Sequence, residues 1–110
     1  MTKADIKTML DGLGVPTAYY QFPDGTDITP PFLVWFYPDS DNLFADNTVY
    51  GTIEQLHIEL YSDEKDFELE GKLETILNDN SLPYHRSEVY VSGEQLFETI
   101  YTTEVYINER

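Results

Sequence analysis

The sequence contains no cysteine, which excludes disulfide bonds and thiolate metal sites. Cations are scarce as well: lysine and arginine total 6 against 21 aspartates and glutamates, which gives a formal net charge of -15. No lysine or arginine occurs from Thr8 through Glu64. Because binding to phosphates requires cations that displace counterions, this composition argues against direct binding to DNA, RNA or anionic membranes. The same charge could also simply keep the protein soluble.

Long apolar runs are also missing, and none approaches the ~20 residues that a membrane-spanning helix needs. The N-terminal segment MTKADIKTMLDGL is charged and amphipathic, without the apolar core of a signal peptide. We therefore expect a product made in the cytoplasm. The 110 residues fit one domain, residues 1–110, which can bury roughly two thirds of its unfolded surface.

Sequence motifs of enzymes are absent: there is no G-x-S-x-G, no phosphate-cradling glycine loop and no Cys-His pair. The two histidines, His57 and His85, lack the spacing of metal ligands on one helix. We therefore predict a protein that is not an enzyme and has no cofactor and no metal.

Apolar periodicity predicts helices at residues 3–13 and 64–79 and strands at 18–22, 32–37, 48–62, 85–91 and 95–108. Thr2 and Asp5 resemble a capping pair for the first helix, and Ser62 or Asp63 is expected to cap the second. The predicted fold class is α+β, a mixed, antiparallel-rich sheet of about five strands with two helices packed on one face.

Three local expectations concern the strands. Residues 32–37 should form a central strand that is buried on both faces and ended by Pro38. Gly51 and Gly93 are expected at a bulge and at a special backbone position of a hairpin loop, respectively. Along residues 48–62, one face should be core and the other wet or an interface; the core side is predicted to carry Leu56, Ile58 and Leu60, and the other side Gln55, His57, Glu59 and Tyr61.

The segment FYPDSDNLFADNTVY, residues 36–50, is rich in aspartate and raises three alternatives: a calcium loop, a catalytic carboxylate cluster or a connector that docks on a partner. A calcium loop of the EF-hand type is disfavoured, because Phe44 replaces the glycine at the sixth position and Tyr50 the glutamate at the twelfth. An apolar tip within an acidic loop is typical of a protein interface. The predicted assembly interface consists of Asp41, Leu43, Phe44, Asp46 and Tyr50.

The order of segments gives a resemblance that covers nearly the whole chain. The helix ends in LGVPTAYYQFPDGT, and PPFLVWFYPDSDNLFADNTVY, IELYSDEKDFELEGKLETIL and LPYHRSEVYVSGEQLFETIYTTEVYI follow. This arrangement resembles small proteins encoded in the head-to-tail gene block of phages and prophages of Gram-positive hosts. Those proteins are similar to the tail-terminator, or head–tail joining, proteins of long-tailed phages. The resemblance supplies no catalytic residue.

The resemblance implies an α+β subunit that assembles as a hexameric ring, ends growth of the tail tube and docks to the head. Implied partners are further copies of the chain, the major tail tube protein and the head connector or stopper protein. The implied location is the virion, with the host cytoplasm during assembly. DNA would pass through the ring, and an acidic lumen would let a polyanion slide without sticking. The charge leaves an alternative function, an acidic DNA mimic that blocks a nucleic-acid-binding protein.

Overall fold

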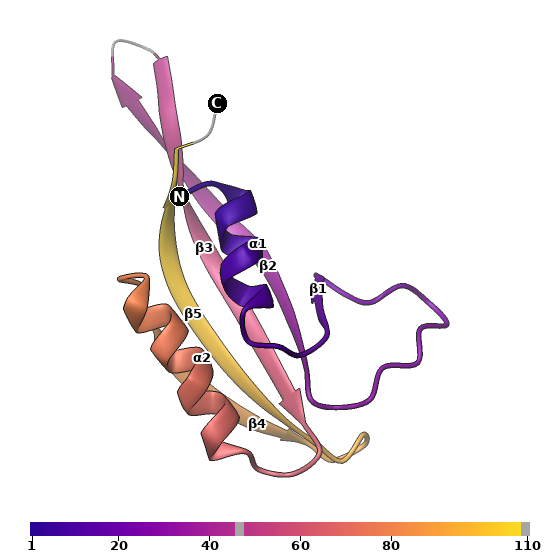
Figure 1. Cartoon of the computed structure of the whole chain (residues 1–110). Helices are drawn as coiled ribbons and strands as arrows, with labels where there is room; N and C mark the ends of the chain where they lie inside the picture. Colours follow the sequence, from indigo (N-terminus) through magenta and orange to yellow (C-terminus); the bar gives the residue numbers. More distant parts are fainter. Residues whose placement is uncertain (46–47, 109–110) are drawn as a thin grey trace.

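A computed structural model describes residues 1–45 and 48–108, with only the backbone for residues 42–45 and 48–50. Within those residues the chain forms two helices and five strands (Figure 1). In chain order these are α1 (Lys3–Asp11), β1 (Thr17–Tyr19), β2 (Phe32–Ala45), β3 (Thr48–Ser62), α2 (Phe67–Asp79), β4 (His85–Val91) and β5 (Leu96–Ile107).

The described strands make one five-stranded sheet in the order β1-β2-β3-β5-β4. β1 pairs with β2 in parallel, and the other three pairs are antiparallel. The prediction of an α+β fold with a mixed, mostly antiparallel sheet is therefore confirmed. Short connections account for two of the antiparallel pairs, since β3 follows β2 closely in the chain and a tight turn joins β4 to β5. The third pair, β3 with β5, joins strands that α2 and β4 separate in the chain.

Both helices begin at capping residues. At α1 the Thr2 hydroxyl accepts a hydrogen bond from the Asp5 amide, and the Asp5 carboxylate accepts one from the Thr2 amide, which confirms the predicted capping pair. At α2 the predicted start and cap are wrong. The cap is Asp66, whose carboxylate accepts a hydrogen bond from the Leu69 amide at 3.0 Å. A capping carboxylate accepts a hydrogen bond from the helical amide three residues after it. Asp63 directly follows the end of β3 at Ser62 and lies too far before the helix to reach such an amide.

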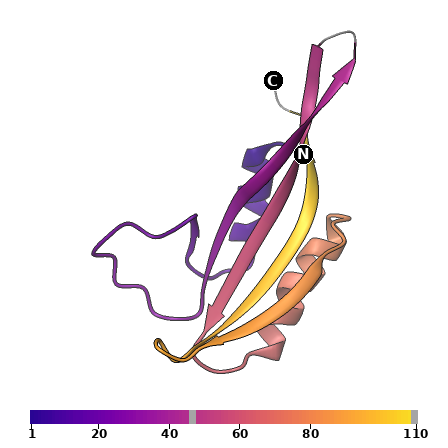
Figure 2. The same cartoon turned by 180° about the vertical axis from the view of Figure 1, so that it is seen from behind.

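One hydrophobic core joins both helices to the sheet. Its members come from α1, from α2 and from all the long central strands; they include Ile6, Leu10, Leu73, Leu77, Leu33, Trp35, Leu56, Ile58, Leu60, Tyr101 and Val105. Leu56, Ile58 and Leu60 are buried as predicted. Both helices are drawn in front of the sheet in Figure 1 and behind it in Figure 2.

The turns differ in part from the expectations. The first strand is shorter than predicted, because Tyr20 takes a φ of 70° and its amide donates to the Trp35 carbonyl at 2.7 Å, which turns the chain away. Between β4 and β5 the residue at positive φ is Gln95, at 54°, so the prediction for Gly93 is wrong. Gly25 takes a φ of 79° in a tight turn after Asp24, where the Thr26 amide donates to the Pro23 carbonyl at 3.1 Å.

Candidate functional site

The segment predicted to be a connector is mostly strand. β2 does not end at Pro38 but continues to Ala45, antiparallel to β3. A register shift between Phe36 and Asp39 takes Pro38 out of the ladder, which removes the need for an amide hydrogen at that position. The sequence does not reveal this part of the strand, because its polar residues lie in a ribbon beyond the core, where no apolar alternation is required.

The β2–β3 hairpin forms an arm that extends past the other strands (Figures 1 and 2). In the described ladders, β5 pairs with β3 only from Thr52 onward, and β1 pairs with β2 only as far as Trp35. The outer part of the arm is therefore a two-stranded ribbon whose outward backbone groups have no strand partner among the described residues. Such edges are templates for pairing with another chain.

Gly51 lies where the arm leaves the sheet. Leu43 pairs with Gly51 while Phe44 pairs with Val49, so the register shifts beside this glycine, as predicted for a bulge. A Cβ atom at position 51 would stand 2.6 Å from the Ile107 carbonyl oxygen. It would also stand 3.0 Å from the Tyr106 ring. The absence of a side chain therefore lets β5 approach the base of the arm.

Four of the five predicted interface residues, Asp41, Leu43, Phe44 and Tyr50, map to this arm. Asp41 is exposed and pairs with Ile53. Leu43, Phe44 and Tyr50 have a described strand backbone only, and Asp46 lies outside the described residues. Their role as an interface stays a prediction.

A second candidate surface is the sheet face opposite the helices, seen in front in Figure 2. We call it the open face. The pairing of β2, β3 and β5 places nine side chains on its central part: Phe32, Val34, Phe36, His57, Glu59, Tyr61, Glu98, Ile100 and Thr102. His85, Ser87 and Val89 of β4 lie beside them on the same face. The predicted polar side of residues 48–62 thus lies on this face.

Aromatic rings cover the β2 side of the open face. Phe32 stacks on Tyr61 with ring centroids 4.9 Å apart, and Phe36 lies 4.7 Å from the His57 ring. Tyr20, 64% exposed, adds an edge contact to Phe36 at 5.4 Å. A strand buried on both faces would cover Phe32 fully, but this ring is only partly buried. Aromatic rings without a covering layer are typical of surfaces that bind another protein.

Two glutamates converge beside these rings. The Tyr61 hydroxyl contacts Glu98 Oε2 and lies 3.2 Å from Glu59 Oε1. His57 Nε2 lies 3.3 Å from Glu59 Oε2. A tyrosine hydroxyl has one hydrogen to donate, so it satisfies only one of the two carboxylates at a time. Sequence reasoning names His57, Glu59 and Tyr61 but misses Glu98; the alternation of residues 96–107 is the signal for its face.

Electrostatics at this cluster follow from burial and like charge. Burial first, and then the Glu98 carboxylate, raise the pKa of Glu59 above its usual value of 4.5, against a smaller opposing effect of His57. Burial and the two neighbouring carboxylates also raise the pKa of the Tyr61 hydroxyl, which therefore stays protonated at physiological pH. Tyr61 is thus a donor here and not a base.

On the helix side of the sheet, the most deeply buried carboxylates are paired with cations. Glu70, on α2 and 4% exposed, contacts Lys65 and accepts from Arg86 Nη2 at 2.7 Å. Arg86 Nη2 also lies 3.1 Å from Glu88 Oε1. Lys3 lies 3.9 Å from the buried Glu54. These pairs tie α1 and α2 to the sheet.

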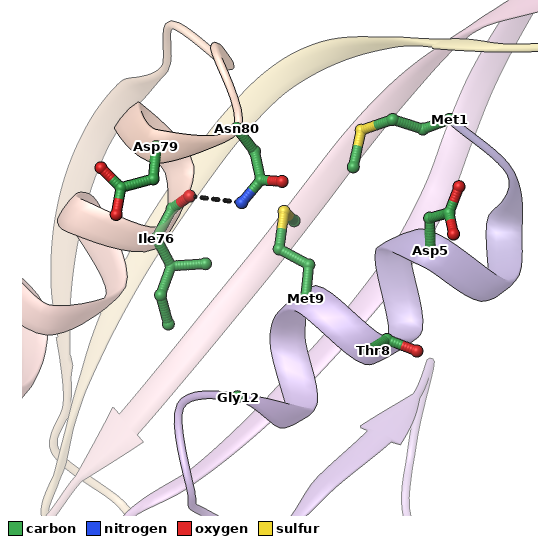
Figure 3. Close-up of a pocket in the computed structure, with 8 residues that line it drawn as sticks. All are labelled: Met1, Asp5, Thr8, Met9, Gly12, Ile76, Asp79 and Asn80. Carbon is green, nitrogen blue, oxygen red and sulfur yellow. Dashed lines mark hydrogen bonds between the residues drawn. The ribbon is translucent and has the colours of Figure 1, made fainter.

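A groove between α1 and α2 encloses about 630 Å³ (Figure 3). Met9 from α1 and Ile76 from α2 line it together with Met1. Its polar groups serve the helix ends, since Asp5 belongs to the cap of α1 and the Asn80 amide donates to the Ile76 carbonyl at 2.8 Å. The groove brings no catalytic pair together.

Among residues 1–45 and 48–108, no group of three or more His, Asp or Glu side chains is arranged to hold a metal ion. In that same part of the chain neither helix is long and apolar enough to cross a membrane. No known family model matches the chain, and no curated protein matches it.

Proposed function

We propose that this chain is a structural, non-enzymatic virion protein of the head–tail junction, of the tail-terminator type. In this proposal two helices cover one face of the sheet, and copies of the chain assemble into a ring through the β2–β3 arm. The ring caps the tail tube and docks to the head connector. The observation that carries the proposal is the arm itself, a two-stranded ribbon that extends beyond the sheet (Figure 1).

An arm of this kind suits assembly for two physical reasons. Its outer backbone edges can pair with a strand of another subunit, and main-chain hydrogen bonds of this kind are a common source of affinity between chains. Its sequence SDNLFADN combines polar residues with Leu43 and Phe44, an apolar pair able to dock in a partner. The acidic composition fits a ring through which DNA must slide without sticking.

The test replaces Leu43 and Phe44 together with serine and supplies the variant to a phage that lacks its own copy of the gene. We expect a normally folded protein and no joined, infectious particles. The matched control is Phe67→Ser, which removes a 74% exposed phenylalanine far from the arm and should leave assembly intact. Normal particle yields from the arm variant would refute the assignment of the arm.

Light scattering after size exclusion provides an independent measurement. With a net charge of -15 per chain, self-repulsion opposes ring closure at low salt and is screened in ~1 M salt, where the Debye length is about 3 Å. The proposal predicts salt-promoted particles of six times the 12.8 kDa chain, on their own or on added tail tubes.

The alternative is an acidic DNA mimic, favoured by the open face with its carboxylates and without lysine or arginine among its nine central residues. It predicts a 1:1 complex with a DNA-binding protein, weakened by salt. Competition with DNA for such a partner, in the absence of any effect on particle assembly, would favour it over the terminator function.

A further inference from the structure

The distribution of charge between the two sides of the sheet is uneven. All five lysines and arginines of residues 1–45 and 48–108 contact groups on the helix side or on the helices themselves; they are Lys3, Lys7, Lys65, Lys72 and Arg86. On the open face, the described polar contacts of Glu59 and Glu98 are with Tyr61, with His57 and with each other, and they include no lysine or arginine. The open face is therefore a negative surface.

This charge decides which occupant can cover the open face. A second copy that presents its own open face would bring Glu59 and Glu98 against the same two carboxylates, and like charges that face each other in an interface oppose binding strongly. Nucleic acid is repelled for the same reason. The complementary partner is a protein surface that carries positive charge.

The rings and carboxylates together favour arginine over lysine. A guanidinium is planar, stacks on aromatic faces and can bond two carboxylate oxygens at once, whereas an ammonium is a strongly hydrated point charge. On the open face the stacked pair of Phe32 and Tyr61 lies directly beside the two glutamates, because Tyr61 pairs with Glu98 across the ladder. A guanidinium here would also supply further donors to the two carboxylates, which share the single Tyr61 hydrogen.

We infer that the open face is a docking surface for an arginine-bearing segment of a different protein, with the guanidinium held by Glu59 and Glu98 against the ring pair of Phe32 and Tyr61. This names a face and a partner chemistry that the proposed function leaves unassigned. Because the outer two-stranded ribbon of the β2–β3 arm is not involved, the inference can fail while ring assembly holds, and the reverse.

The test titrates the full, isotope-labelled chain with a short peptide of alternating arginine and glycine and records amide chemical shifts. We expect the largest shift changes at residues 32–36, 57–61 and 98–102. Glu59→Gln with Glu98→Gln should weaken binding about tenfold, which corresponds to about 1.4 kcal/mol. The control double variant, Glu64→Gln with Glu68→Gln, removes the same charge from exposed positions just before and within α2 and should change affinity less than about twofold.

Two further comparisons separate the rings from the charge. A lysine peptide of the same length should bind more weakly than the arginine peptide, and Phe32→Leu should abolish that preference while it keeps an apolar side chain. Equal losses in both double variants, or shift changes spread over every acidic segment, would reduce the binding to diffuse attraction and overturn the inference. Concentration-dependent self-association through the open face would overturn it in favour of a second copy.

Discussion

Replacement of Arg86 by methionine tests whether a buried ion pair fixes α2 to β4. Arg86 Nη2 donates to Glu70 Oε1 at 2.7 Å, and the Glu70 side chain is only 5% exposed. Removing one partner of a buried pair costs about 3–5 kcal/mol, because the remaining charge is left without compensation. Lys65 still contacts Glu70, and Arg86 itself is 35% exposed. We therefore expect the free energy of unfolding to fall by less than that range, by about 2 kcal/mol.

The assay is equilibrium unfolding in urea, followed by the fluorescence of Trp35, the chain's one tryptophan, which is 6% exposed. The midpoint should fall with an unchanged slope, since the loss changes stability and not the surface exposed on unfolding. In thermal unfolding the same loss should lower Tm by roughly 8 °C.

The matched control is Lys7→Met, which also makes the net charge more negative by one. Lys7 lies 2.8 Å from Asp11, but both side chains are exposed, at 64% and 43%, so its loss should cost at most about 0.5 kcal/mol. If Lys7→Met destabilised the protein as much as Arg86→Met, overall charge rather than the local pair would be responsible. A cost below about 0.5 kcal/mol for Arg86→Met would refute the reasoning outright.

Two further predictions concern the arm and the open face. Gly51→Ala should lower the free energy of unfolding by about 1–3 kcal/mol, because the new Cβ would stand 2.6 Å from the Ile107 carbonyl oxygen and must push β5 away. Urea unfolding measures this loss, and an unchanged midpoint would show that the arm adapts to the new side chain. Glu59 has a folded-state pKa raised above 4.5, so its contribution to stability is fully present below pH ~4.5 and is lost as the pH rises through the raised value. Glu59→Gln should therefore stabilise the protein at pH 7 and lose that advantage at low pH; urea midpoints across this range check it, and a constant difference would contradict it.

β3 and β4 begin and end at the predicted residues. Along β3, alternation between core and water leaves a clear pattern. The residues of β4 are nearly all exposed, and β-branched and aromatic residues indicate that strand instead. The outer half of β2 has no such pattern, since Asp39, Ser40 and Asp41 are exposed in a ribbon beyond the core. Its polarity and Pro38 therefore indicate a loop, and only the pairing with β3 shows otherwise.

The candidate surface is predictable to a similar degree. Alternation along residues 48–62 places His57, Glu59 and Tyr61 on one side of the strand. Which residues of the neighbouring strand lie opposite them depends on the register in which the two strands pair. Glu98 meets Tyr61 because β5 pairs antiparallel with β3, a contact between residues 37 positions apart. Local sequence carries no information on which of several acidic residues such a register selects.

The positions of the cations explain how a chain with a net charge of -15 can keep its fold and still offer a binding surface. The most buried carboxylates, Glu54 and Glu70, are 6% and 4% exposed, and each has a cation within 4 Å. An unpaired charge at such depth would cost several kcal/mol, whereas a carboxylate in contact with water costs little. Lys3, Lys65 and Arg86 therefore lie beside the most deeply buried carboxylates, and much of the negative charge that remains lies on the outside. On the open face that charge adjoins a ring pair, Phe32 and Tyr61, so a cationic partner gains both contacts at one place.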